Sequence, residues 1–212
     1  INPSIDFSGT WTTAVPENKD GTVGNEALSG PSHWPLTPKG KLQVESFDAS
    51  KDPMFKCIFY GVPRLAASVY SRRLIRESDK LIIQQEQYPI VRVIHLNDSP
   101  PPEAFTPNTI GYSTGKFTSD KTLIVKTTGF SYTPWGSAAG LDSSNQKEVI
   151  EKYQLSANGL QLHYSHTLTD PVYLREPVTV SLIYNKIQDR EFIYEECDTN
   201  SARIPLDFRS SP

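Results

Sequence analysis

The chain has 212 residues, with 21 Lys and Arg against 24 Asp and Glu, which gives a formal net charge of −3. A charge this close to zero argues against nucleic acid or an anionic membrane as the main partner. Hydrophobic residues make up 37% and charged residues 21%, so wholesale disorder is excluded. No stretch approaches the roughly 18 consecutive apolar residues that a spanning helix needs, so we expect no membrane span. The length suits one large domain, and we expect residues 1–212 to form a single β-barrel domain.

The first third of the chain predicts one short strand and one helix. Residues 7–11 are expected to form the strand, and a long loop rich in Gly, Pro, Asn and Ser follows. Thr37-Pro38 is typical of a helix N-cap with proline in the first turn, which makes residues 37–49 the best helix candidate. Gly40 counts against this helix, because glycine is unfavourable in helix interiors. Residues 52–68 are interpreted as a structured loop.

The remaining sequence has the pattern of strands. The 10 Tyr, 9 Phe and 3 Trp of the whole chain suit pleated, half-buried surfaces. Asn158-Gly159 is a strong hairpin signal, and residues 97–102 and 129–145 have the composition of exposed loops. Short turns between consecutive strands favour an all-β protein, an antiparallel meander of about 8–10 strands that closes into a barrel, with one short N-terminal helix. The predicted strands cover residues 69–77, 80–88, 90–96, 111–118, 121–128, 146–156, 160–169, 178–187 and 191–197.

The 2 cysteines are Cys57 and Cys197. In a secreted or periplasmic protein they would pair and close a long loop, worth roughly 3–5 kcal/mol. The alternative is two unrelated buried thiols. The chain begins at Ile1, which indicates that a leader has been removed or that the chain was trimmed.

Two short motifs are open to a catalytic or metal-binding interpretation. Residues 111–115 match G-x-S-x-G, but no helix is expected after them, so Ser113 belongs on a strand or turn and not on a hydrolase elbow. His163 and His166 are three residues apart on a predicted strand, so they point to opposite faces and form no metal pair. Glycine-rich phosphate loops and dinucleotide fingerprints are absent, and we expect neither a metal nor a cofactor.

Glu86 and Arg92 are the first candidate pair. If the strand ran unbroken, Gln84, Glu86, Tyr88, Ile90 and Arg92 would share one face, and an interior Glu–Arg pair would suit a ligand pocket or proton transfer. Pro89 would break this register if it inserts a turn. The alternative is a partly exposed salt bridge worth under about 1 kcal/mol.

A second candidate cluster comes from the hairpin around Asn158-Gly159. Its short turn places Tyr153 close to Tyr164, with Glu151 and His166 on the same hairpin. Aromatic and imidazole groups facing a barrel cavity would suit a flat ligand. Cross-strand pairs on the surface of the sheet are the alternative.

Several phrases occur in a fixed order along the chain: Leu36-Thr37-Pro38-x-Gly40, Cys57-x-x-x-Gly61-x-Pro63-Arg64, Glu86 with Arg92, Gly111-x-Ser113-x-Gly115-Lys116-Phe117, Asp120-x-x-Leu123-Ile124-Val125 with Thr127, Glu151-x-Tyr153, Asp170-Pro171 and Glu195-x-Cys197. With these phrases the chain resembles a group of exported bacterial proteins with lipocalin-like β-barrels and no assigned reaction, over residues 34–200. The chain departs from the family pattern at Tyr112, where the family usually has His, and at Phe117, where it usually has Trp. The resemblance implies an exported lipocalin-like barrel.

Three functions remain open from the sequence. The first is binding of a small apolar or aromatic molecule in the barrel cavity of a periplasmic or secreted protein. The second is a cofactor-independent isomerase, lyase or cyclase that acts by proton transfer in the same cavity. The third is a structural module of the cell envelope with a filled barrel. The expected catalytic residues are Glu86, Arg92 and His166, and the expected ligand-binding residues are Tyr88, Tyr112, Ser113, Tyr153 and Tyr164.

Overall fold

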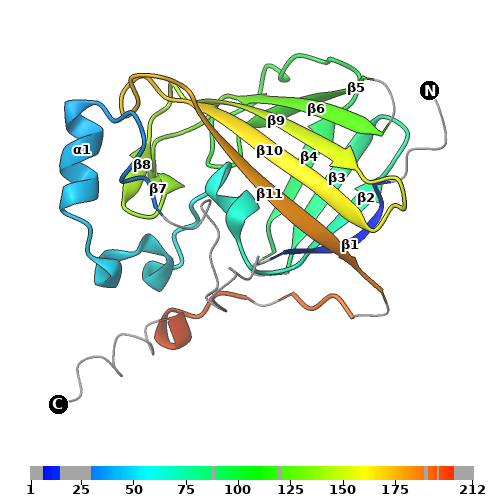
Figure 1. Cartoon of the computed structure of the whole chain (residues 1–212), viewed down its shortest axis with the longest axis horizontal. Helices are drawn as coiled ribbons and strands as arrows, with labels where there is room; N and C mark the ends of the chain where they lie inside the picture. The colour runs from blue at the N-terminus through cyan, green and yellow to red at the C-terminus, as the bar shows by residue number, and fades with distance from the viewer. Residues whose placement is uncertain are drawn as a thin grey trace.

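The computed structural model describes residues 7–14, 30–86, 89–118, 121–188, 191–194 and 196–202. Within these ranges, nine strands close into a barrel in the order β1-β11-β10-β9-β6-β5-β4-β3-β2 (Figure 1). The first strand closes the barrel because it pairs with β11 on one side and with β2 on the other. The prediction of an all-β barrel with little helix is confirmed. The barrel strands are β1 (Gly9–Thr13), β2 (Arg72–Arg76), β3 (Lys80–Gln85), β4 (Val91–His95), β5 (Tyr112–Phe117), β6 (Thr122–Thr128), β9 (Glu148–Leu155), β10 (Gln161–Thr169) and β11 (Val178–Ile187).

Neighbouring barrel strands run antiparallel except for β4 and β5, which are parallel, with Ile94 opposite Ser113. Parallel neighbours cannot be joined by a tight turn, and residues 96–111 supply the longer connection that this pair needs. The sequence predicts an antiparallel meander throughout, and the structure differs from that prediction at β4 and β5. It is interrupted a second time between β6 and β9, which are neighbours in the barrel although β7 and β8 lie between them in sequence.

Alternation along the strands fills the barrel interior. On β10, Leu162, Tyr164, His166 and Leu168 are buried, whereas the residues between them are exposed or half-buried. A core of large side chains occupies the barrel, and a second core lies toward the end where β10 stops and β11 begins. The first core includes Trp11, Leu74, Leu123, Tyr153, Tyr164 and Tyr184. The second includes Leu36, Phe130, Leu141, Leu168 and Tyr173.

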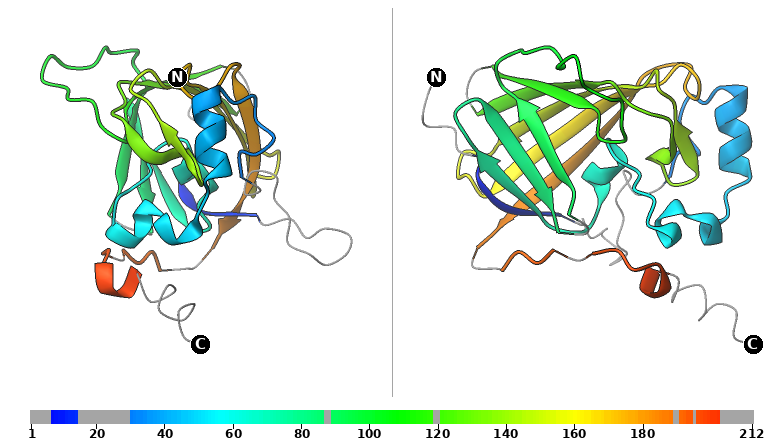
Figure 2. Two further views of the ribbon diagram at one scale, coloured as in Figure 1. Left: turned by 90° about the vertical axis from the view of Figure 1, so that its left-hand side faces the viewer. Right: turned by 180° about the vertical axis from the view of Figure 1, so that it is seen from behind.

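A layer of short elements covers this second core (Figure 2). It consists of the helix α1 (Pro38–Glu45), three 3-10 helices (Ala49–Lys51, Pro53–Lys56 and Arg64–Ala67) and the hairpin of β7 (Thr133–Ala138) and β8 (Leu141–Ser143). The prediction of an exposed loop over residues 129–145 is therefore wrong. Phe130 and Leu141 in this segment are fully buried, because they pack into the second core.

Helix α1 begins where the sequence predicted. The Thr37 hydroxyl accepts from the Gly40 backbone N–H at 3.2 Å, and Pro38 occupies the first turn. Gly40 is needed for packing, since a Cβ there would lie 2.5 Å from the carbonyl oxygen of Tyr173. The glycine that counted against the helix in the sequence thus lets the helix approach the barrel closely.

The C-terminal part of the described chain adds no strand. The sequence predicts a strand over residues 191–197 as the hairpin partner of β11, but the residues described there, 191–194, 196 and 197, are not in a strand. Both edges of β11 are already paired, with β10 and with β1, so no edge remains for a further strand. Cys197 instead reaches Cys57 across the covering layer in a disulfide, with the two Cα atoms 5.8 Å apart, which confirms the expected pairing. Among the described helices, none has the length and apolar character needed to cross a bilayer.

Candidate functional site

A charged network lies inside the barrel around Arg92. Its guanidinium pairs with the Glu151 carboxylate, with Nη1 2.9 Å from Oε1 and a second short contact from Nη2 to Oε2. The same guanidinium donates from Nε to the Ser113 hydroxyl at 3.1 Å and from Nη2 to the Thr127 hydroxyl at 2.8 Å. Strands β4, β5, β6 and β9 each contribute one of these residues, so the network joins four strands from within.

Two tyrosines and Thr127 also donate to the Glu151 carboxylate, the Thr127 hydroxyl to Oε2 at 3.5 Å. The hydroxyls of Tyr153 and Tyr164 donate to Oε1 at 2.9 and 3.0 Å. Burial raises the pKa of Glu151, but the adjacent guanidinium of Arg92 outweighs burial and holds the pKa below its usual value. Glu151 is therefore a carboxylate at neutral pH. Burial and the charge of Glu151 raise the pKa values of both tyrosines, so their hydroxyls remain donors.

The expected pair of Glu86 and Arg92 is replaced by the pair of Arg92 and Glu151. The chain reverses between β3 and β4, so that Arg92 lies opposite Ile83, and the even-numbered residues of the two strands do not share a face. Glu86 is buried beyond the end of β3, where its carboxylate accepts from the backbone N–H of Ser71 at 3.3 Å. Of the two alternatives left open by the sequence, the unbroken strand does not form, and the register is broken between β3 and β4.

The other predicted residues divide between the interior and the surface. Tyr153 and Tyr164 lie opposite each other in the sheet, with ring centroids 5.0 Å apart, and Ser113 belongs to the Arg92 network. Tyr112 lies on the outside, where it stacks on His95 and donates to the carbonyl of Ser99 at 3.1 Å. Tyr88 falls outside the described residues.

The barrel interior next to this network has little free space. The cavity lined by Arg92, Tyr153 and Tyr184 has a volume of about 20 Å³. A water molecule needs at least about 10–15 Å³, so this cavity can hold one water but no organic ligand. Two buried atoms without a described partner, Arg72 Nε and Gln85 Oε1, belong to residues that line it.

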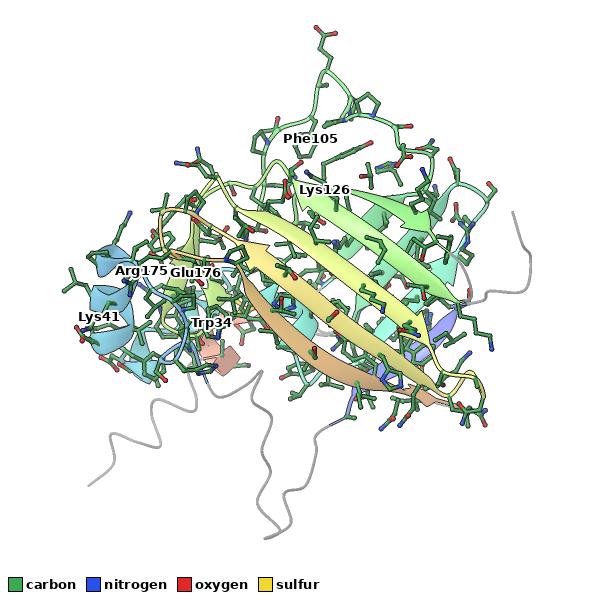
Figure 3. All side chains as sticks on the ribbon, turned by 45° about the horizontal axis from the view of Figure 1, so that its top comes forward. Trp34, Lys41, Phe105, Lys126, Arg175 and Glu176 are labelled. Atoms are coloured by element: carbon green, nitrogen blue, oxygen red, sulfur yellow. A yellow bond between two sulfur atoms is a disulfide. The ribbon has the colours of Figure 1, made fainter. Side chains whose placement is uncertain are left out.

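A larger cleft lies at the end of the barrel, between the strands and the covering layer. Its volume is about 200 Å³. Strands β10 and β11 contribute His166 and Val180, the covering layer contributes Arg64 and Ser137, and Trp34, labelled in Figure 3, comes from the segment before α1. The remaining lining residues are Gly30, Tyr60, Pro63, Ala67, Ser68, Ala138 and Ala139.

Two buried polar atoms of the cleft residues have no hydrogen-bond partner among the described residues. They are Nδ1 of His166, whose residue is 4% exposed, and Oγ of Ser137, whose residue is 3% exposed, and neither atom itself has appreciable accessible surface. Burial lowers the pKa of His166 to about 4, although the nearby Glu151 carboxylate opposes this shift. The imidazole is therefore neutral at physiological pH, with one nitrogen that donates and one that accepts.

The charge of Arg64 in the cleft wall is compensated. Its Nη2 lies 2.8 Å from Oδ2 of Asp52, and its Nη1 donates to the Trp135 carbonyl at 3.4 Å. The guanidinium also stacks over the ring of Tyr60, 4.2 Å from the centroid. The cleft therefore combines an apolar wall, a paired cation and two unpartnered polar atoms.

Sequence reasoning missed Ser137 and did not assign Glu151 to Arg92. Ser137 lies in the segment interpreted as an exposed loop, and its sequence carries no signal of burial. The sequence around Glu151 does carry a signal of burial, because Glu151 lies between Val149 and Tyr153 on the inward-facing positions of an alternating strand. No group of three or more His, Cys, Asp or Glu side chains suited to a metal occurs in the parts of the chain that the structure describes.

Comparison with known proteins does not assign the chain to a family. No family model matches it, and no curated protein matches it.

Proposed function

We propose that this protein binds a small organic molecule in the cleft between the barrel and its covering layer. The observation that carries the proposal is the pair of unpartnered buried atoms, His166 Nδ1 and Ser137 Oγ, on residues that line a largely apolar space of about 200 Å³. A buried polar group without a partner costs about 1–3 kcal/mol, and a bound molecule could recover part of that free energy. Concave, mostly apolar spaces with a few polar groups are typical of ligand sites.

The proposed site lies at the end of the barrel and not at its centre. The sequence predicts a ligand in the centre of the barrel, but the space left there holds about one water. Large side chains occupy the rest of the interior, among them Trp11, Tyr153, Tyr164 and Tyr184. We further propose that the protein works in an oxidising compartment, outside the cytoplasm. The disulfide of Cys57 and Cys197 supports this, since stable disulfides are typical of exported proteins.

A second candidate is proton-transfer catalysis in the same cleft. His166 lies directly opposite Glu151 in the sheet, so a buried carboxylate could orient the imidazole or stabilise its charged form. Glu86 and Arg92 do not line the cleft, so this alternative assigns the proton transfer to His166. The pKa of His166, about 4, makes it a weak base at neutral pH, which is why binding is the preferred proposal.

Native mass spectrometry of the protein from an oxidising compartment, compared with its denatured spectrum, tests for a molecule that copurifies. Ligand-observed NMR with a library of one-ring compounds then tests for weaker binders. Ala139→Trp should fill the cleft and abolish binding, whereas Ala157→Trp, at the exposed β9–β10 turn, should leave it intact. A bare native mass together with no binder in the library would refute the proposal. If the protein converts a bound compound and His166→Gln abolishes that conversion, catalysis is the favoured function.

A further inference from the structure

The cleft constrains the chemistry of its ligand, and this inference rests on the proposed function. The first constraint is size. An apolar cavity of about 150 Å³ in another protein accommodates benzene. A space of about 200 Å³ therefore fits one six-membered ring with a few further atoms.

The second constraint is the shape and polarity of the walls. Trp34 and Tyr60 contribute aromatic surfaces, and Pro63 and Val180 contribute aliphatic ones. Aromatic rings pair well with other rings in offset or edge-to-face arrangements. Walls of this kind favour a planar ring over a flexible chain.

The third constraint is charge. Arg64 is already paired with Asp52 and stacked on Tyr60, and His166 is neutral. No other charged side chain lines the cleft among the described residues. An ionised ligand would leave water without gaining an unpaired counter-charge, which is unfavourable. The cleft therefore favours an uncharged molecule.

The fourth constraint comes from the unpartnered atoms. Ser137 Oγ can both donate and accept, and His166 Nδ1 does either according to its tautomer. Both atoms have almost no accessible surface in this structure, so each pairs with a ligand only when its side chain rotates toward the cleft. A ligand hydroxyl has one donor and two acceptor positions, so it can pair with Ser137 Oγ or His166 Nδ1 whether that atom donates or accepts. A ligand without a polar group would leave both atoms unpaired.

Taken together, we infer that the cleft binds an uncharged monocyclic aromatic compound with a hydroxyl group, a phenol, whose hydroxyl pairs with Ser137 or His166.

The test compares three probes of similar size on the full chain with its disulfide intact: phenol, toluene and benzoate. Protein amide shifts in NMR titrations report the Kd of each. We expect phenol to bind about 10-fold or more tightly than toluene, because toluene leaves the polar atoms unpaired. We expect benzoate to bind more weakly than phenol. This ranking is measured on the unmodified protein, so it does not depend on whether a variant folds.

Two variants then assign the polar contact. Ser137→Ala and His166→Phe should between them remove the preference for phenol, while each retains toluene binding. Ser165→Ala is the matched control, because Ser165 lies on β10 beside His166 but does not line the cleft. Equal affinities for toluene and phenol would overturn the hydroxyl inference and leave the proposed function standing. Tightest binding of benzoate would also overturn it, in favour of an anion held by Arg64. Failure of all three probes would overturn this inference, and failure of the whole one-ring library would refute the binding function as well.

Discussion

Removing one partner of the buried pair of Arg92 and Glu151 should strongly destabilise the barrel. The side chain of Arg92 is 5% exposed and that of Glu151 is fully buried. Arg92→Met keeps the aliphatic volume but removes the guanidinium, leaving the buried Glu151 carboxylate with hydroxyl donors alone, from Tyr153, Tyr164 and, at 3.5 Å, Thr127. Removal of one partner from a buried ion pair costs about 3–5 kcal/mol. Urea denaturation followed by circular dichroism should show that loss in the free energy of unfolding.

The neighbouring strands provide a matched control. Lys126 on β6 and Glu148 on β9 form an ion pair of 2.7 Å on the outer surface, where the two side chains are 56% and 39% exposed (Figure 3 labels Lys126). Lys126→Met should cost no more than about 1 kcal/mol, since exposed pairs contribute little. If Arg92→Met proved as mild as this control, the assignment of the interior charge to Glu151 would be incorrect.

Three further changes test other parts of the structure. Burial lowers the pKa of Lys147 to about 7 from 10.5, so between these pH values the unfolded chain holds a proton that the folded chain lacks. The free energy of unfolding should then rise with pH by up to ~1.4 kcal/mol per unit, and Lys147→Met should flatten this slope in pH-dependent denaturation. Cys57→Ser opens a disulfide that spans 140 positions and should cost about 4–5 kcal/mol in urea; an unchanged midpoint would contradict the pairing. Gly61→Ala should lower the Tm far more than Gly159→Ala, because both residues have positive φ but only at Gly61 would a Cβ meet the Thr109 carbonyl, at 1.9 Å.

The parts of the fold set by local chemistry were predictable from the sequence. Strand β11 has the expected bounds, residues 178–187, because its alternation is long and unbroken. The Thr37-Pro38 pair predicted the start of α1, and the Asn158-Gly159 turn predicted that Tyr153 lies beside Tyr164. Each of these signals lies within a few residues of the feature that it predicts.

Features that depend on distant segments were not predictable in this way. Arg92 and Glu151 are 59 positions apart, and nothing local indicates that β4 and β9 face each other across the barrel. The parallel pair of β4 and β5 depends on where the long connection between them passes. Ser137 lies in a segment rich in Gly and Ser, and it is buried only because Leu141 and Phe130 anchor that segment in the second core.

The contrast between the two cavities is the physical reason to place function at the end of the barrel. Both contain residues with buried polar atoms that lack a partner among the described residues, so an unpaired atom alone does not distinguish them. In the interior, Arg72 and Gln85 line about 20 Å³, which has room for one water and no organic molecule. At the barrel end, His166 and Ser137 line about 200 Å³ of largely apolar space, where water would pair with few groups. Water bound in that space forgoes hydrogen bonds that it makes in bulk, so its displacement by an apolar ring with one well-placed polar group is favourable. Free volume together with unmet hydrogen bonding, and not the presence of charged residues, therefore identifies the candidate site in this barrel.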